Sequence, residues 1–191
     1  MLTIRVTDGC WLVPLDLADA DELFALTDSN RGYLRQWLPW LDSVRRLDDT
    51  RTFIRAAQAQ AARNDGVQLA LLVDGRIAGM VGHHHIDWRN RSTSLGYWIG
   101  ESYQGRGLTT AACRALIDRA FDTARLHRIE IRCAAGNHRS RAIPVRLGLR
   151  EEGLLRDAEW LYDHFVDHVV YATLAKEWRA AEDRTGSGRG R

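Results

Sequence analysis

The most specific chemical feature of the sequence is a loop with two glycines, Gly105 and Gly107, between an expected strand and an expected long helix. Glycine lets the backbone turn tightly and approach a ligand closely. The first turn of a helix presents unpaired N–H groups and the positive end of the helix dipole, and Arg106 adds a positive charge. This combination favours a pyrophosphate-binding loop, although an ordinary strand-to-helix turn fits the spacing equally well.

Two side chains near this loop or after it could move a proton. Glu101 lies where the expected strand 93–100 meets the loop, so its carboxylate could accept a proton directly or through a water molecule. A solvated carboxylate at a strand end is the alternative. Ser140 follows Asn137 by three residues at the start of an expected helix. Both residue types cap helices well, so their spacing alone favours capping over catalysis.

Three consecutive histidines suggest a metal site at first sight. Within a strand, His83 and His85 face one side and His84 faces the other. Two histidines could bind zinc, but third and fourth ligands are not evident, so we expect no metal. We instead expect the side of His83 and His85 to line a substrate site and His84 to face the core or solvent.

Hydrophobic periodicity predicts the elements that must position these residues. Strands are expected at 4–6, 11–13, 67–73, 77–86, 93–100 and 128–133, with two more near the C-terminus. Helices are expected at 17–29, from a cap at Asp48 or Asp49 to about residue 63, at 108–124 and at 139–147. The strands between residues 67 and 100 indicate an antiparallel meander. The strand–helix–strand order that follows implies a parallel crossover between 93–100 and 128–133.

Length and charge narrow the class of protein. The chain has 191 residues, which suits one soluble domain, and its net charge of +2 is too weak to argue for nucleic-acid binding on its own. No apolar run approaches the ~20 residues of a membrane span. The first residues lack the features of a signal peptide. We therefore expect one domain over residues 1–178 and a disordered tail over residues 179–191.

The number and spacing of the cysteines indicate a reducing cellular compartment. Their odd number, without metal-binding spacing, is typical of reduced thiols in a cytoplasmic protein. Cys133 shares a strand face with Ile129 and Ile131, which predicts a buried core thiol.

The glycine loop also resembles a known signature. Gln104-x-x-Gly107-x-Thr109 is similar to the Q/R-x-x-G-x-G/A motif of the GNAT acetyltransferases, with Thr in a place that usually holds Gly or Ala. This departure should matter little if only the backbone N–H group is used.

Further segments sharpen the resemblance. Residues 96–102, 137–140 and 146–153, together with the late Tyr171, resemble the ribosomal-protein N-terminal acetyltransferases of the RimJ/RimL type. The likeness covers about residues 10–178. The signature alone is moderately specific, and the added segments make the resemblance strong.

The resemblance implies a fold and a pose for acetyl-CoA. The expected fold is the α/β (α+β) acyl-CoA N-acyltransferase fold, with a mixed, mostly antiparallel central sheet flanked by helices. Two parallel strands splay apart, and the pantetheine arm inserts between them and pairs with main-chain groups near Ile99. The pyrophosphate is expected on the loop formed by Gln104, Gly105, Arg106, Gly107, Leu108 and Thr109.

The resemblance also implies roles at the thioester. Glu101 is expected to take a proton from the attacking amine, and Ser140 is expected to donate one to the departing sulfur. Asn137 is expected beside the pantetheine. The aromatic link at residues 37–40 is expected over the acceptor entrance, although a packed corner between two helices is the alternative.

The first-choice acceptor is a protein N-terminal α-amine, because its pKa of about 7.7–8.0 lets a modest base such as Glu101 suffice. Polyamines, aminoglycosides and small metabolites stay open as acceptors. A non-catalytic acyl-CoA sensor also stays open, although the presence of both Glu101 and Ser140 favours an enzyme. The absence of a basic patch or an aromatic RNA-binding motif disfavours an RNA-binding factor. Family members often pair and the chain has seven tryptophans, so a homodimer is expected.

Overall fold

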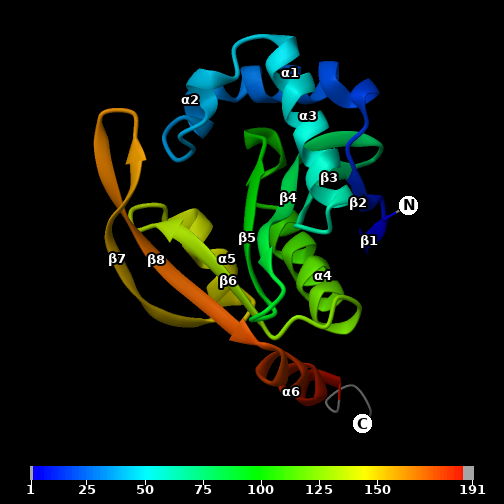
Figure 1. Ribbon diagram of the computed structural model, residues 1–191, viewed down its shortest axis with the longest axis vertical. Helices are drawn as coiled ribbons and strands as arrows, with labels where there is room; N and C mark the ends of the chain where they lie inside the picture. The colour runs from blue at the N-terminus through cyan, green and yellow to red at the C-terminus, as the bar shows by residue number, and fades with distance from the viewer. Residues whose placement is uncertain (1, 187–191) are drawn as a thin grey trace.

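The computed structural model describes the backbone of residues 2–186 and the side chains of residues 2–180. Its eight strands form one sheet in the order β1-β2-β3-β4-β5-β6-β8-β7 (Figure 1). The strands are β1 (Ile4–Thr7), β2 (Cys10–Pro14), β3 (Val67–Val73), β4 (Arg76–Asp87), β5 (Ser92–Ile99), β6 (Arg128–Ala134), β7 (Arg150–Leu161) and β8 (His164–Leu174). The helices are α1 (Ala20–Ser29), α2 (Arg31–Leu34), α3 (Leu47–Ala62), α4 (Leu108–Asp122), α5 (His138–Arg146) and α6 (Ala175–Gly186), with 3-10 turns η1 (Leu17–Asp19), η2 (Leu41–Ser43) and η3 (Glu101–Tyr103).

Only one pair of neighbouring strands in this sheet is parallel. β5 and β6 run in the same direction and are joined through α4, and the other neighbours are antiparallel. The predicted fold class, the meander and the crossover are therefore confirmed. The parallel pairing spans three residue pairs and ends where Ser94 lies opposite Glu130. Beyond this point the two strands diverge, and Figure 1 shows the separation widening toward the top of the view.

Helices cover both faces of the sheet. The alternating residues of β3 show which side chains pack against the helices on each face. Alternate residues of a strand point to opposite sides. Leu69 and Leu71 are fully buried in a core that includes Leu116 of α4. Ala70 belongs instead to a second core, with Leu23 of α1 and further residues of α3. Among the residues that the structure describes, no helix is both long and apolar enough to cross a membrane.

Two predictions differ from the structure at helix ends. The N-cap residue of α3 is Arg46, so the predicted cap at Asp48 or Asp49 was wrong. Asp49 acts from inside the first turn, where its carboxylate accepts the backbone N–H groups of Arg45 and Arg46 at 2.9 and 2.8 Å. At the other end of the chain, α6 continues to residue 186, over part of the segment predicted as a disordered tail. The rest of that segment, residues 187–191, lies outside the described residues.

A close approach between β4 and β5 gives a test of this packing. A Cβ atom added at Gly79 would lie 2.7 Å from the Cα atom of Ile99 and would also meet the carbonyl oxygen of Trp98. Gly79→Ala should therefore lower the unfolding free energy by about 1–3 kcal/mol, as overpacking in a core does. Urea unfolding measures this loss.

Gly32 provides the matched control, because a Cβ atom there meets nothing within 4 Å. Gly32→Ala in α2 should leave stability unchanged or raise it slightly. Equal stability of the two variants would contradict the close packing of β4 on β5.

Candidate active site

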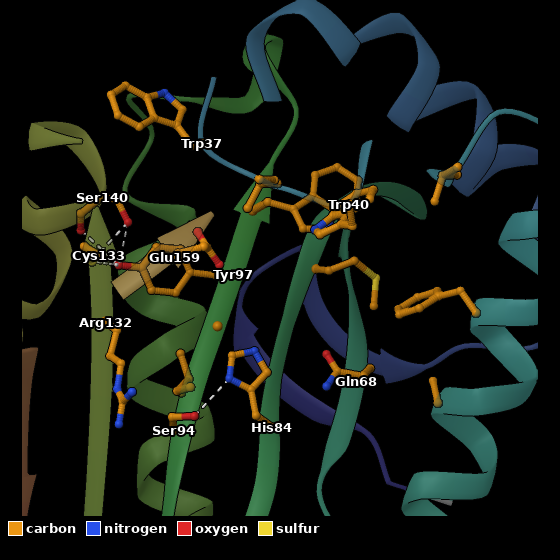
Figure 2. A pocket seen from close by; sticks show the side chains of 18 of the residues that line it. Trp37, Trp40, Gln68, His84, Ser94, Tyr97, Arg132, Cys133, Ser140 and Glu159 are labelled. Atoms are coloured by element: carbon orange, nitrogen blue, oxygen red, sulfur yellow. Dashed lines mark hydrogen bonds between the residues drawn. The ribbon is translucent and has the colours of Figure 1, made fainter. Parts of the chain in front are cut away.

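A cavity of about 1060 Å³ opens where β5 and β6 part. Its walls come from α3, from the link between α2 and α3, from β4, β5 and β6, and from the hairpin of β7 and β8. Figure 2 shows Trp37, Trp40, Tyr97, Ser140 and Glu159 around it. A cavity of this size is at the upper end of the range for small-ligand pockets, so it has room for more than a simple amine.

Three hydrogen-bonding side chains meet on one wall of this cavity. The Tyr97 hydroxyl donates to the Ser140 carbonyl oxygen at 2.9 Å, and the Ser140 hydroxyl donates to Tyr97 Oη at 3.2 Å. Cys133 Sγ lies 3.3 Å from Ser140 Oγ. Burial raises the pKa of the Tyr97 phenol well above its usual range and also raises the pKa of the Cys133 thiol. The cluster therefore stays protonated at neutral pH and can supply hydrogen bonds to a sulfur or an oxygen atom.

The helix start beside this cluster shows the capping that the Asn137 and Ser140 spacing favoured, and the roles of both residues at the thioester stay predictions. Asn137 is the N-cap of α5, and its side-chain oxygen accepts the backbone N–H of Ser140 at 3.1 Å. Both residues also line the cavity. Capping and a role in the site are thus compatible, because the cap fixes the end of the helix that carries the Ser140 hydroxyl.

Glu101 does not line this cavity, whereas Ser140 does. Glu101 begins η3 as an exposed residue, and its backbone N–H donates to Asn30 Oδ1 at 2.8 Å. Its predicted role as proton acceptor stays a prediction.

A different carboxylate lines the cavity and was missed by the sequence analysis. Glu159 of β7 reaches the same cavity as Ser140, and its side chain is 32% exposed. Its carboxylate lies 3.4 Å from His168 Nε2 on β8. No local pattern marks Glu159, because β7 reaches the site only through the pairing of β8 with β6.

The three histidines occupy three different environments. His84, and not His83 or His85, lines the cavity, so the predicted orientation was wrong. The Nδ1 atom of His84 lies 2.9 Å from Ser94 Oγ, and burial together with the nearby Arg132 lowers the pKa of its imidazole. His83 is buried. Among the described residues, no three His, Cys, Asp or Glu side chains gather in a way that could hold a metal ion.

The glycine loop has the geometry that its sequence indicated. Gly105 and Gly107 adopt left-handed backbone angles, with φ of 74° and 73°, and Gly107 is the N-cap of α4. Open space surrounds both, since an added Cβ atom would meet nothing within 4 Å. The first-turn N–H groups of α4 lack helical partners, and Gln104 Nε2 is buried without a partner while its Oε1 accepts from Arg139 at 2.7 Å. These features fit an anionic group such as a pyrophosphate.

Comparison with known proteins identifies the family. The acetyltransferase (GNAT) domain model matches residues 10–150. The chain is also similar to the YdaF protein of Bacillus subtilis (strain 168), with 37% identity over 179 residues that cover 93% of this chain and 98% of YdaF. The chain therefore belongs to the GNAT acetyltransferase family. Within that class it is an N-acetyltransferase, which confirms the predicted resemblance.

Two solved structures share the fold over most of their length. RimL, a ribosomal L7/L12 alpha-N-protein acetyltransferase in complex with coenzyme A, is 25% identical with a TM-score of 0.88, over 91% of this chain and 98% of that one. The Microcin C7 self immunity acetyltransferase MccE, in complex with acetyl-CoA and AMP, is 30% identical with a TM-score of 0.86, over 88% of this chain and 94% of that one.

The buried His83 generates a prediction on pH and stability. Burial lowers the pKa of His83 to about 4, against an ordinary value of 6.5. Between these values the unfolded chain binds more protons than the folded protein, so the unfolding free energy falls as pH drops from 6.5 toward 4, by at most about 3 kcal/mol. His83→Phe should remove this part of the pH dependence. Urea unfolding of both proteins at about pH 7 and about pH 5 checks it, and equal pH slopes would contradict it.

Proposed function

We propose that the protein transfers the acetyl group of acetyl-CoA to the α-amine of a protein N-terminus. The observation that carries this proposal is the large cavity that meets the hydrogen-bonding cluster of Tyr97, Cys133 and Ser140 where β5 and β6 part. RimL, which shares the fold, is described as an alpha-N-protein acetyltransferase, and MccE has been solved with acetyl-CoA. Both descriptions support the proposed donor, and that of RimL supports the proposed acceptor.

Acetyl-CoA would lie along the parted strands. Its pyrophosphate would accept hydrogen bonds from the N-terminal turn of α4, where Leu108 and Thr109 follow the two glycines. Its pantetheine arm would pair with the backbone of β5 between Ser94 and Ile99, because β5 has no partner on β6 beyond Ser94. Asn137 would lie beside this arm. The group bound there supplies a thioester carbonyl that a neutral amine can attack.

The chemistry then needs one proton acceptor and one donor. The acceptor ammonium must lose a proton before its nitrogen attacks the carbonyl carbon, after which the C–N bond forms and the C–S bond breaks. Ser140 would donate a hydrogen bond to the departing sulfur. Of the two candidate bases, Glu159 lines the cavity and Glu101 does not, so we favour Glu159. An α-amine has a pKa of about 7.7–8.0, so a carboxylate can remove its proton near neutral pH.

A small-molecule amine is the second candidate acceptor. The MccE structure contains AMP, so an acetyltransferase of this fold can hold a nucleotide. In this chain, Trp37 and Trp40 line the cavity and offer flat apolar surfaces. A panel of peptides and small amines in a thiol-release assay with acetyl-CoA separates the two candidates.

We further propose a homodimer in the cytoplasm. Four large apolar side chains of the β7–β8 hairpin are exposed, namely Leu154, Leu155, Trp160 and Phe165, and exposed apolar surface on one hairpin supports an interface there. The three cysteines are buried and free, which suits a reducing compartment. We assign the acetyltransferase domain to residues 1–178.

The loop assignment predicts a loss of cofactor binding on substitution of Gly107. A β-branched residue is strained at its left-handed φ of 73°. Acetyl-CoA should raise the melting temperature of the wild type by binding the native state, and Gly107→Val should lose most of that increase. A normal increase in the variant would show that the loop does not hold acetyl-CoA.

The proton acceptor is tested by comparing two carboxylates. Glu159→Gln should lower kcat with a peptide acceptor by about 10²-fold or more, as loss of acid–base assistance does. The loss should shrink at higher pH, where the amine is already neutral. Glu101→Gln should retain most of the activity. A pH–rate profile of both variants measures this, and the reverse result would restore Glu101 as the base.

Ser140→Ala should also lower kcat, because the departing sulfur loses its hydrogen-bond donor. Raising the pH should not rescue this variant, since deprotonating the amine does not replace that donor. The same pH–rate series measures it, with the acetyl-CoA melting shift as the control for an intact cofactor site.

A further inference from the structure

The β7–β8 hairpin extends beyond the sheet that supports it. β8 pairs with β6 from Leu174 to His168, and the hairpin turn lies further along, between Leu161 and His164. Figure 1 shows this end of the hairpin standing beyond β6, toward the segment that follows α2. The outer part of the hairpin therefore depends on other contacts for its position.

A register shift marks where the outer part begins. The pairing of β7 with β8 is irregular between Leu155 and Glu159, and Asp157 has a positive φ of 49°. The backbone N–H of Asp157 donates to Asp167 Oδ1 at 2.9 Å, across the two strands. A bulge bends a strand locally and interrupts its ladder. The outer hairpin can therefore pivot at this point more easily than elsewhere along β7.

The tip of the hairpin is fastened to the link that covers the cavity. We call residues 35–42, which follow α2 and run into η2, the strap. The Tyr162 hydroxyl donates to the Leu38 carbonyl oxygen at 2.5 Å, and the Arg35 guanidinium lies 3.8 Å from the centre of the Tyr162 ring. Arg35 is itself held by Asp42 through two hydrogen bonds of 2.9 and 2.8 Å. Tyr162 thus uses its hydroxyl and its ring to join the hairpin to the strap.

The strap is a firm anchor for this contact. Arg31 donates to the carbonyl oxygens of Leu41 and Val44 at 2.5 and 2.6 Å, which fixes the far end of the strap. Trp40 packs against Trp98 of β5 with ring centres 6.2 Å apart. The strap is tied to the body of the protein at several points, so the hairpin tip is the more easily displaced of the two partners.

The candidate base lies on the outer hairpin between the bulge and the tip. Glu159 is three residues before Tyr162, and it faces the cavity that the strap also lines through Leu38 and Trp40. We propose that Tyr162 is a positioning residue, which by docking the hairpin tip on the strap holds Glu159 at the acceptor amine. Release of the tip withdraws Glu159 and widens the acceptor side of the cavity. This inference rests on the proposed function and on Glu159 as its base.

The test is a double-mutant cycle with a peptide acceptor. Tyr162→Ala should lower kcat by about 10-fold, because a small misplacement of a catalytic group costs this much or more, and should leave KM for acetyl-CoA unchanged. Tyr162→Phe, which keeps the ring under Arg35, should show a smaller loss. In a Glu159→Gln background, either substitution should have little further effect, because the carboxylate to be positioned is gone.

His164→Ala is the matched control on the same turn, where the His164 side chain contacts Asp163, and it should behave as wild type. If Tyr162→Ala does not fold, Tyr162→Phe carries the cycle, with the melting temperature as the check. Equal losses in both backgrounds, or no loss in either, would overturn the inference alone. Full activity of Glu159→Gln would overturn the inference together with the base assignment, and a wild type inactive on peptides would overturn the proposed function.

Discussion

The parting of β5 and β6 after three residue pairs is the constraint on which the rest of the site depends. Buried backbone groups need hydrogen-bond partners, so a strand that loses its neighbour must find another partner. Across the resulting gap, Tyr97 Oη from β5 lies 3.7 Å from Cys133 Sγ of β6, and both residues also contact Ser140 of α5. The gap thus creates a place for an extended ligand and gathers protonated groups beside it. The cavity opens beside the same gap.

The local elements could be predicted from the sequence because their signals are local. Gly105 and Gly107 mark the turn before α4, because the left-handed backbone angles of that turn favour glycine. The apolar residues of α4 recur with helical spacing, which marks the helix itself. Glu159 could not be found in this way. Its strand pairs only with β8, which returns from the far end of the chain to pair with β6. That arrangement is long-range, and no spacing within residues 150–161 records it.

The histidines show a second limit of local patterns. Strand alternation separates His84 from His83 correctly, but it does not say which face carries the cavity. That choice depends on where α3 and the strap cover the sheet, and they cover the face of His84. A register shift between His83 and Ile86 then gives His85 an environment of its own, beside Asp65. Glu101 was likewise assigned from its place in the chain; the structure shows it exposed and outside the cavity lining, and its role stays a prediction.

The most direct test of the account locates the transferred acetyl group. A peptide with a free N-terminus and an internal lysine is incubated with the protein and acetyl-CoA, and tandem mass spectrometry then assigns the modified nitrogen. The account predicts one added acetyl group, on the N-terminal α-amine, and no product when that amine is blocked. Acetylation of the lysine side chain in either peptide, or no acetylated peptide while a small amine is modified, would contradict it.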